Sequence, residues 1–333
     1  MGRSLRAFRH SRYFPDSRYL PAAVVGLLTA ASAGLFAGSY TYAMANPTPR
    51  HVPVAIVDRA DPAFVDALGD GLGTSLERHH YRTRPQAVDA VQDQRVFGIV
   101  SERGGVVELD TVGAAGSEVA ALLARTGREA AAESGTRLRV RDIRPLHRGD
   151  PRGLALFYVT IAAVIVGFLG AVQLAINARE LRPLERVACT AGYAVLGGFA
   201  IVGVVSWLTG AAGLPFVQSW VILSLTMFAS GMIYTMFNAL VGRWALLPTW
   251  VLMVMLGNPS SGGAVSWPLL PALLGAIGRW LPPGAAVNAL HNAVYFPGHQ
   301  HAQPYAVLLA WTLLATTIFA VRRDRHPGGR PGR

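Results

Sequence analysis

The chain alternates between long apolar runs without charge and one stretch of mixed polarity. Six runs contain no Arg, Asp, Glu or His, and they lie at 20–45, 154–176, 188–210, 216–241, 244–256 and 304–321. A helix crosses a bilayer with about 20 apolar residues, so each run is a candidate span. The fifth run is short and ends at Gly257. The pattern predicts an all-α polytopic membrane protein with six spans.

Residues 46–153, between the first two runs, have shorter periods. Every fourth residue over 64–76 is apolar, which predicts a helix, and Asp61 is placed to cap it. Another helix is expected at 118–133, capped by Ser117. Apolar runs and alternating patterns predict strands at 51–57, 96–100, 106–109 and 138–143. We therefore expect a small α/β domain built around a βαβ unit and inserted between the first two spans.

Residues 257–303 separate the last two apolar runs. Two apolar pieces within them, 267–280 and 285–296, are too short to cross a bilayer. We predict two short re-entrant helices in the outer leaflet; the alternative is an extracellular loop resting on the membrane surface. Three amphipathic rings are expected at the membrane interface, those of Trp267, Trp280 and Tyr295.

Charge predicts the orientation of these elements. Residues 46–153 carry 15 Arg and 15 acidic residues, whereas the whole chain has a net charge of +11. Nearly all of this excess lies in four places: residues 1–19, 177–187, Arg243 and the basic tail 322–333. Six alternating spans put all four on one side, which by the positive-inside rule is the cytoplasm. We expect a plasma-membrane protein with cytoplasmic termini and an extracytoplasmic domain, and we do not expect nucleic-acid binding.

The first apolar run ends in Ala43-Met44-Ala45, which is similar to a signal-peptidase site. The run is longer than the roughly 7–15 apolar residues of a signal peptide, so we predict an uncleaved anchor. Cleavage after Ala45 would leave five spans and the same external domain.

The chemistry-bearing residues predict no catalytic site, cofactor or metal. All 30 basic residues are arginine, so the chain has no lysine that could bind phosphate in a P-loop or form a Schiff base. The single cysteine, Cys189, lies in an apolar run and is expected to be a small buried residue. His291, His299 and His301 have no zinc-site spacing, so we expect solvated loop histidines. We predict a protein that is not an enzyme and does not hydrolyse ATP itself.

The spans offer only weakly polar groups, and this argues against an ion-driven carrier, which needs charge at membrane depth. These groups are candidates for a membrane pathway, and the alternative is that they only join helices. They are Gln173, Ser206, Gln218, Ser224, Thr226, Ser230 and Asn238.

Several stretches resemble permeases of the ABC-2 type, close to the phage infection protein (YhgE/Pip) branch. One amino-terminal span, an external α/β domain and five further spans make up the same layout. The likeness covers essentially the whole chain and is carried by residues 51–58, 84–91, 97–100, 150–153 with Tyr158, 257–263, and the Leu-Pro pairs 270–271 and 281–282.

The resemblance implies a permease that pairs as a homodimer or heterodimer and is driven by a separate ATP-binding subunit. The ATPase would dock on residues 1–18 and on a coupling loop at 178–187, whose charged residues are Arg179, Glu180, Arg182, Glu185 and Arg186. The alternative is that these charges only set topology. The expected activity is export of a hydrophobic or lipid-like compound. A second hypothesis is a non-transporting scaffold or receptor whose external domain binds a partner.

Overall fold

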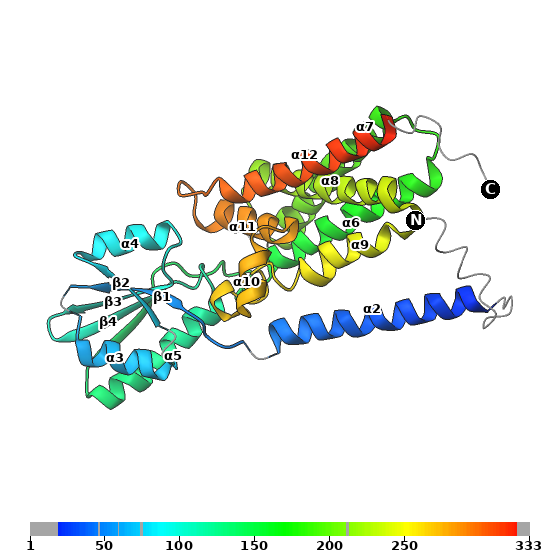
Figure 1. Ribbon diagram of the computed structural model, residues 1–333. Helices are drawn as coiled ribbons and strands as arrows, with labels where there is room; N and C mark the ends of the chain where they lie inside the picture. The colour runs from blue at the N-terminus through cyan, green and yellow to red at the C-terminus, as the bar shows by residue number, and fades with distance from the viewer. Residues whose placement is uncertain (1–18, 46, 59, 74–75, 211–212, 325–333) are drawn as a thin grey trace.

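The computed structural model describes residues 19–45, 47–58, 60–73, 76–210 and 213–324 and contains a small α/β domain and a helical bundle. The sheet has five strands in the order β2-β1-β3-β4-β5 (Figure 1). Only the β3–β4 pair is antiparallel. The strands are β1 Val52–Val57, β2 Leu76–Tyr81, β3 Gly98–Arg103, β4 Val106–Thr111 and β5 Leu138–Asp142.

Helices cover both faces of this sheet. α3 (Pro62–Gly71) and α5 (Ser117–Ser134) pack on one face, whereas α4 (Arg84–Gln92) packs on the other (Figure 1). Asp61 caps α3 as predicted, because its carboxylate accepts the N–H of Ala63 at 3.0 Å. These elements confirm the small α/β region.

Two local predictions within this domain were wrong. The four-residue period suggested that the first helix continues to residue 76, but α3 ends at Gly71 and Gly73 adopts φ +64°. A positive φ favours glycine and stops the helix, so Leu76 instead begins β2. Ser117 is not the cap of α5: Gly116 takes that position, and the Ser117 hydroxyl donates to the carbonyl of Arg152 at 3.2 Å.

Among the described residues, five helices are long and apolar enough to cross a membrane, and this length and composition are typical of a multi-pass membrane protein. In the predicted order they are α2 Leu20–Met44, α6 Ala155–Asn177, α7 Pro183–Gly203 with its π-helical continuation η1 Val204–Thr209, α8 Phe216–Val241 and α12 Gln303–Asp324. The fifth predicted span is shorter. It consists of α9 (Leu246–Trp250) and a π-helix, η3 (Val251–Leu256).

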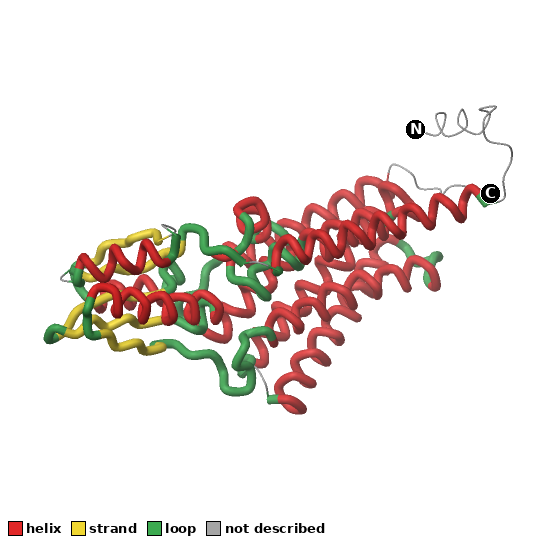
Figure 2. Tube along the Cα trace, turned by 90° about the horizontal axis from the view of Figure 1, so that it is seen from below, coloured by secondary structure: helices red, strands yellow, loops and turns green. Residues whose placement is uncertain are grey.

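The sheet and the helical bundle occupy opposite ends of the molecule, as Figure 2 shows from below. The first residues of α2 and the last residues of α12 both lie at the end away from the sheet (Figure 1). α9 and η3 lead from that end back toward the domain (Figure 1). The five long helices and the shorter α9–η3 therefore run alternately toward and away from the sheet.

α8 lies at the centre of the bundle and packs against α6, α7 and α12. Small residues allow this close approach. A Cβ at Gly198 of α7 would lie 2.4 Å from the hydroxyl of Ser224, and one at Gly167 of α6 would lie 2.6 Å from the carbonyl oxygen of Met227. Such contacts are typical of membrane helices, which associate through packing of small side chains. Most of α2 is exposed, and its contacts with the bundle include a hydrogen bond from Ser39 to the carbonyl of Met255.

Residues 257–303 form short helices, as the sequence indicated: η4 (Trp267–Leu269), α10 (Ala272–Gly278) and α11 (Pro282–Tyr295). They lie between the sheet and the long helices (Figure 1). Trp267 and Trp280 are exposed, but Tyr295, expected with them at the membrane interface, is buried. It is buried because α11 packs into the bundle against α6, α8 and α12.

Candidate functional site

The α/β domain and residues 257–303 share a hydrophobic core. Val265, Leu269, Leu270 and Leu274 are buried in the same cluster as the apolar faces of β1, α3 and α5. The backbone N–H of Arg50, just before β1, donates to the carbonyl of Pro268 at 2.7 Å. The domain is therefore joined to this segment by apolar burial as well as by polar contacts.

Polar contacts tie the same domain to α11. Arg144, which follows β5, donates to the carbonyl of Tyr295 at 2.5 Å, and its guanidinium lies 5.2 Å from the centre of the Phe296 ring. The Nε2 of His291 contacts the carbonyl of Ala114, in the turn that follows β4. Burial lowers the pKa of His291 from 6.5 to about 4, so it is neutral at physiological pH. The neutral ring then donates its Nε2 proton to that carbonyl.

A third contact joins α4 to the loop before α12. The Nδ1 of His299 lies 3.2 Å from the carboxylate of Asp93, and the Nε2 of His301 lies 3.1 Å from the Asp93 carbonyl. The contact with His299 is the main cause of a lowered pKa for Asp93, and Arg95 adds to it. The prediction of solvated loop histidines was thus wrong for His291 alone, since His299 and His301 are exposed and lie in the loop before α12. His291 sits on a helix against the domain, and the other two pair with Asp93.

These histidines do not come together. Within the described ranges, no three side chains of the His, Cys, Asp or Glu type are placed to hold a metal ion.

A cavity of about 640 Å³ lies where the domain meets residues 257–303. Its walls come from the start of α5, from the loop 260–264, from α10 and from α11. The side chains that line it are aromatic, cationic and small polar, and they include Phe97, Trp267, Trp280, Arg50, Arg152 and Arg279. Its volume falls within the range of about 300–1,000 Å³ that is usual for small-molecule sites.

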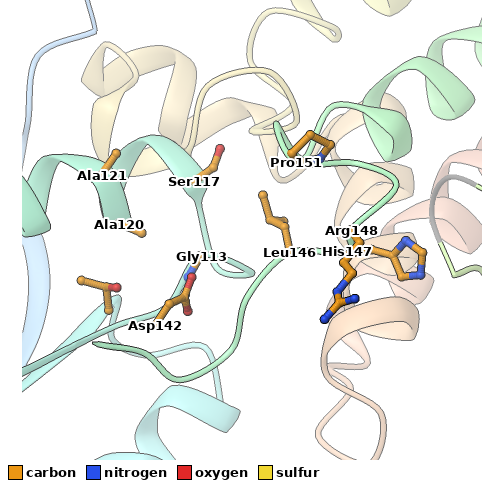
Figure 3. A pocket seen from close by; sticks show the side chains of 10 residues that line it. Gly113, Ser117, Ala120, Ala121, Asp142, Leu146, His147, Arg148 and Pro151 are labelled. Carbon is orange, nitrogen blue, oxygen red and sulfur yellow. The ribbon is translucent and has the colours of Figure 1, made fainter. Parts of the chain in front are cut away.

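A second, more open pocket of about 420 Å³ lies beside the start of α5 and shares Gly113, Ser117 and Leu146 with the first. Figure 3 shows Ser117, Leu146 and Asp142 around it, with Pro151 on the loop that leads to α6. Asp142 is already used here, since its carboxylate accepts the N–H groups of Gly113 and Arg144 at 3.1 and 3.0 Å. Both bonds end on Oδ1, so this carboxylate oxygen holds the turn after β4 against the residues that follow β5.

The candidate pathway residues do not form one cluster. Ser230 joins helices, because its hydroxyl donates to the Val164 carbonyl of α6 at 2.7 Å. Thr226 donates to a carbonyl of its own helix. Gln218 donates to Gln300 and Tyr305 at the domain end of the bundle. Of the remaining four, Ser206 and Ser224 have buried hydroxyls without a hydrogen-bond partner in the described chain, Gln173 accepts from the Asn177 side chain, and Asn238 lies near the end of α8.

The predicted coupling loop is divided by the start of α7. Arg179, Glu180 and Arg182 are exposed, as a docking surface requires. The Glu185 carboxylate instead accepts the N–H of Arg182 at 2.8 Å and caps the helix. Arg186 is only 7% exposed and donates to the carbonyl of Ala178 at 2.9 Å. Arg186 therefore does not belong to the exposed surface of this loop, because the helix turns its side chain into the protein, and docking of an ATPase on the loop stays a prediction.

Sequence reasoning missed the residues that connect the domain to the bundle, notably Arg144 and Asp93. Neither belongs to a motif, and both lie among many other charged residues of the domain. The single available signal was the grouping of His291, His299 and His301 in the segment that the domain contacts.

Comparison of the chain with models of protein families, with curated proteins and with solved structures finds no match.

Proposed function

We propose that the chain is the membrane-spanning subunit of an exporter that moves a hydrophobic or lipid-like compound and takes its energy from a separate ATPase. The observation that carries this proposal is the seating of the α/β domain on residues 257–303. These residues connect the short helix α9–η3 to α12. A change in the packing of the long helices would therefore move the segment that supports the domain and lines its cavity. A simple anchored domain would need no such shared core.

The distribution of arginine supports a cytoplasmic location for the end opposite the domain. Arg179 and Arg182 lie between α6 and α7, Arg243 follows α8, and Arg322 and Arg323 end α12. All belong to the end away from the sheet, and this bias is what the positive-inside rule uses. With six passes, both termini would be cytoplasmic and the domain extracytoplasmic.

The interior of the bundle favours a hydrophobic or lipid-like cargo over an inorganic ion. The described spans carry no acidic side chain at mid-helix, and several of their hydroxyl groups donate to carbonyls within the protein. An ion-coupled carrier would need groups that titrate or coordinate at membrane depth. The chain also lacks lysine, so it cannot build the P-loop of an ATPase. The energy would therefore come from a partner, and the resemblance to ABC-2 permeases implies a dimer.

The proposed docking surface for that ATPase can be tested by substituting two exposed arginines. We expect Arg179→Glu together with Arg182→Glu to abolish ATPase co-purification and ATP-dependent export in proteoliposomes, because charge pairs at an interface are reversed. The matched control reverses Arg137 and Arg139 on the domain, at the other end of the molecule, and should leave both unchanged. Arg186 is not substituted, since removal of a buried arginine would test folding.

The outcome separates the two hypotheses for this protein. Export that persists in the Arg179/Arg182 variant would reject this loop as the docking site. If no neighbouring ATPase co-purifies, and no ATP-dependent export is seen with any candidate ATPase, the permease is rejected and the scaffold or receptor hypothesis takes its place.

A further inference from the structure

We propose that the 640 Å³ cavity between the α/β domain and residues 257–303 binds a small amphipathic anion, whose charge is met by arginines and whose apolar part is met by aromatic rings. This inference rests on the proposed function and names the substrate class of the permease. The cavity lies at the domain end of the bundle, where a cargo would leave the membrane under the proposed orientation.

The charge of the cavity wall favours an anion. The cavity is lined by three arginines, Arg50, Arg152 and Arg279, and by one carboxylate, that of Glu118. The formal charge of its lining is therefore +2. The ion pairs found in the described part of the chain all involve other residues, so these three cations have no carboxylate partner there. Burial raises the pKa of Glu118, which favours its neutral form relative to a free carboxyl group.

The start of α5 adds positive potential at the same wall. Residues 116–118 line the cavity, and no side chain caps the helix at Gly116. The first N–H groups of an 18-residue helix therefore face this region without a side-chain acceptor. They reinforce the three arginines and would stabilise a negative head group.

The remaining wall suits an apolar chain. Phe97 of the domain and Trp267 of η4 meet edge to face with ring centres 5.6 Å apart, and both line the cavity. Phe157, Leu270 and Trp280 add further apolar surface. An inorganic anion would not contact this apolar surface, and an uncharged hydrocarbon would not pair with the arginines. A ligand with both a charged group and an apolar part would contact both.

The test uses the full chain in nanodiscs of uncharged phosphatidylcholine. The probe is a dansyl-labelled undecanoic acid, and its methyl ester is the uncharged control. We expect the acid to bind, dodecanoate and dodecyl phosphate to displace it, and dodecanol to fail. Equal binding of acid and ester, or no binding of the acid, would overturn the proposal.

The residues are tested by charge removal at exposed positions. Arg50→Gln, Arg152→Gln and Arg279→Gln in one protein should weaken binding of the acid by at least about fivefold. The matched control, with Gln at Arg125, Arg128 and Arg139, removes the same charge from the domain surface away from the cavity and should bind as the unaltered protein does. An equal loss in both proteins would show a general field effect and refute the site.

Two further measurements identify the source of the ligand and separate this inference from the permease. Nanodiscs with phosphatidylglycerol that block the probe would identify a bilayer lipid as the occupant, and unchanged binding would identify a free amphiphile; the site stands in either case. Export that persists in the triple variant after probe binding is lost would reject the cavity as the substrate site. Probe binding by a chain that exports nothing would support the cavity and reject the permease.

Discussion

Three helices of the bundle meet at Gly231, and this contact gives the sharpest test of the packing. The Tyr193 hydroxyl of α7 donates to the Gly167 carbonyl of α6 at 2.6 Å. A Cβ at Gly231 of α8 would lie 2.3 Å from that hydroxyl and 2.9 Å from the Thr190 methyl group. Gly231→Ala must therefore displace Tyr193 or separate the helices.

The expected cost follows from these contacts. Loss of the hydrogen bond costs about 0.5–1.5 kcal/mol, and overpacking of a core costs about 1–3 kcal/mol, so Gly231→Ala should destabilise the bundle by about 2–4 kcal/mol. Tyr193→Phe alone should cost about 1 kcal/mol. In the double variant the closest clash is absent, so the total should be smaller than the sum by about 1 kcal/mol or more.

The assay is reversible unfolding in mixed micelles with increasing dodecyl sulfate, followed by circular dichroism. Gly192→Ala is the control, since it lies on α7 near Tyr193 and a Cβ there meets nothing within 4 Å. It should be neutral or stabilising by up to about 1 kcal/mol, because alanine favours helix over glycine. If Gly231→Ala costs no more than Gly192→Ala, or if the double variant is additive, the three-helix contact described here does not exist.

Two other predictions concern the contact between the domain and α11, and the topology. His291 has a folded pKa of about 4 against 6.5, so its contribution to stability is complete above pH 6.5 and is lost progressively as the pH falls from 6.5 to about 4, with a loss of about 2 kcal/mol by about pH 5. His291→Gln should remove this part of the pH dependence of unfolding, and identical pH profiles would refute it. In a Cys189→Ala background, a membrane-impermeant maleimide should label Glu102→Cys but not Glu180→Cys in intact cells, and the reverse labelling would invert the topology.

The sequence predicted those elements whose signal lies in contiguous residues. Uncharged runs identified the five long helices, and the apolar residues of β1 and β3 identified buried strands. β2 was missed because it lies at the edge of the sheet, and its side chains read Leu-Glu-Arg-His-His-Tyr, with no apolar face to detect. Burial of Arg186 was missed for another reason. This burial depends on the residue at which α7 begins and on the segments that pack beside the helix. Neither can be inferred from the residues next to Arg186 in the sequence.

The domain and the bundle provide each other with hydrogen-bond partners for backbone groups, and they also bury each other's apolar side chains. η3 ends at Leu256, and the chain that continues toward the domain is non-helical, so its buried backbone groups need partners elsewhere in the protein. Asn258 and Ser260 are buried, and Ser260 donates to the carbonyl of Leu256 at 2.6 Å. Further along, the domain supplies the partner, because the N–H of Arg50 meets the carbonyl of Pro268. Removal of the domain would therefore expose both this carbonyl and the leucines that fill the shared core, so the two parts are expected to fold as one unit.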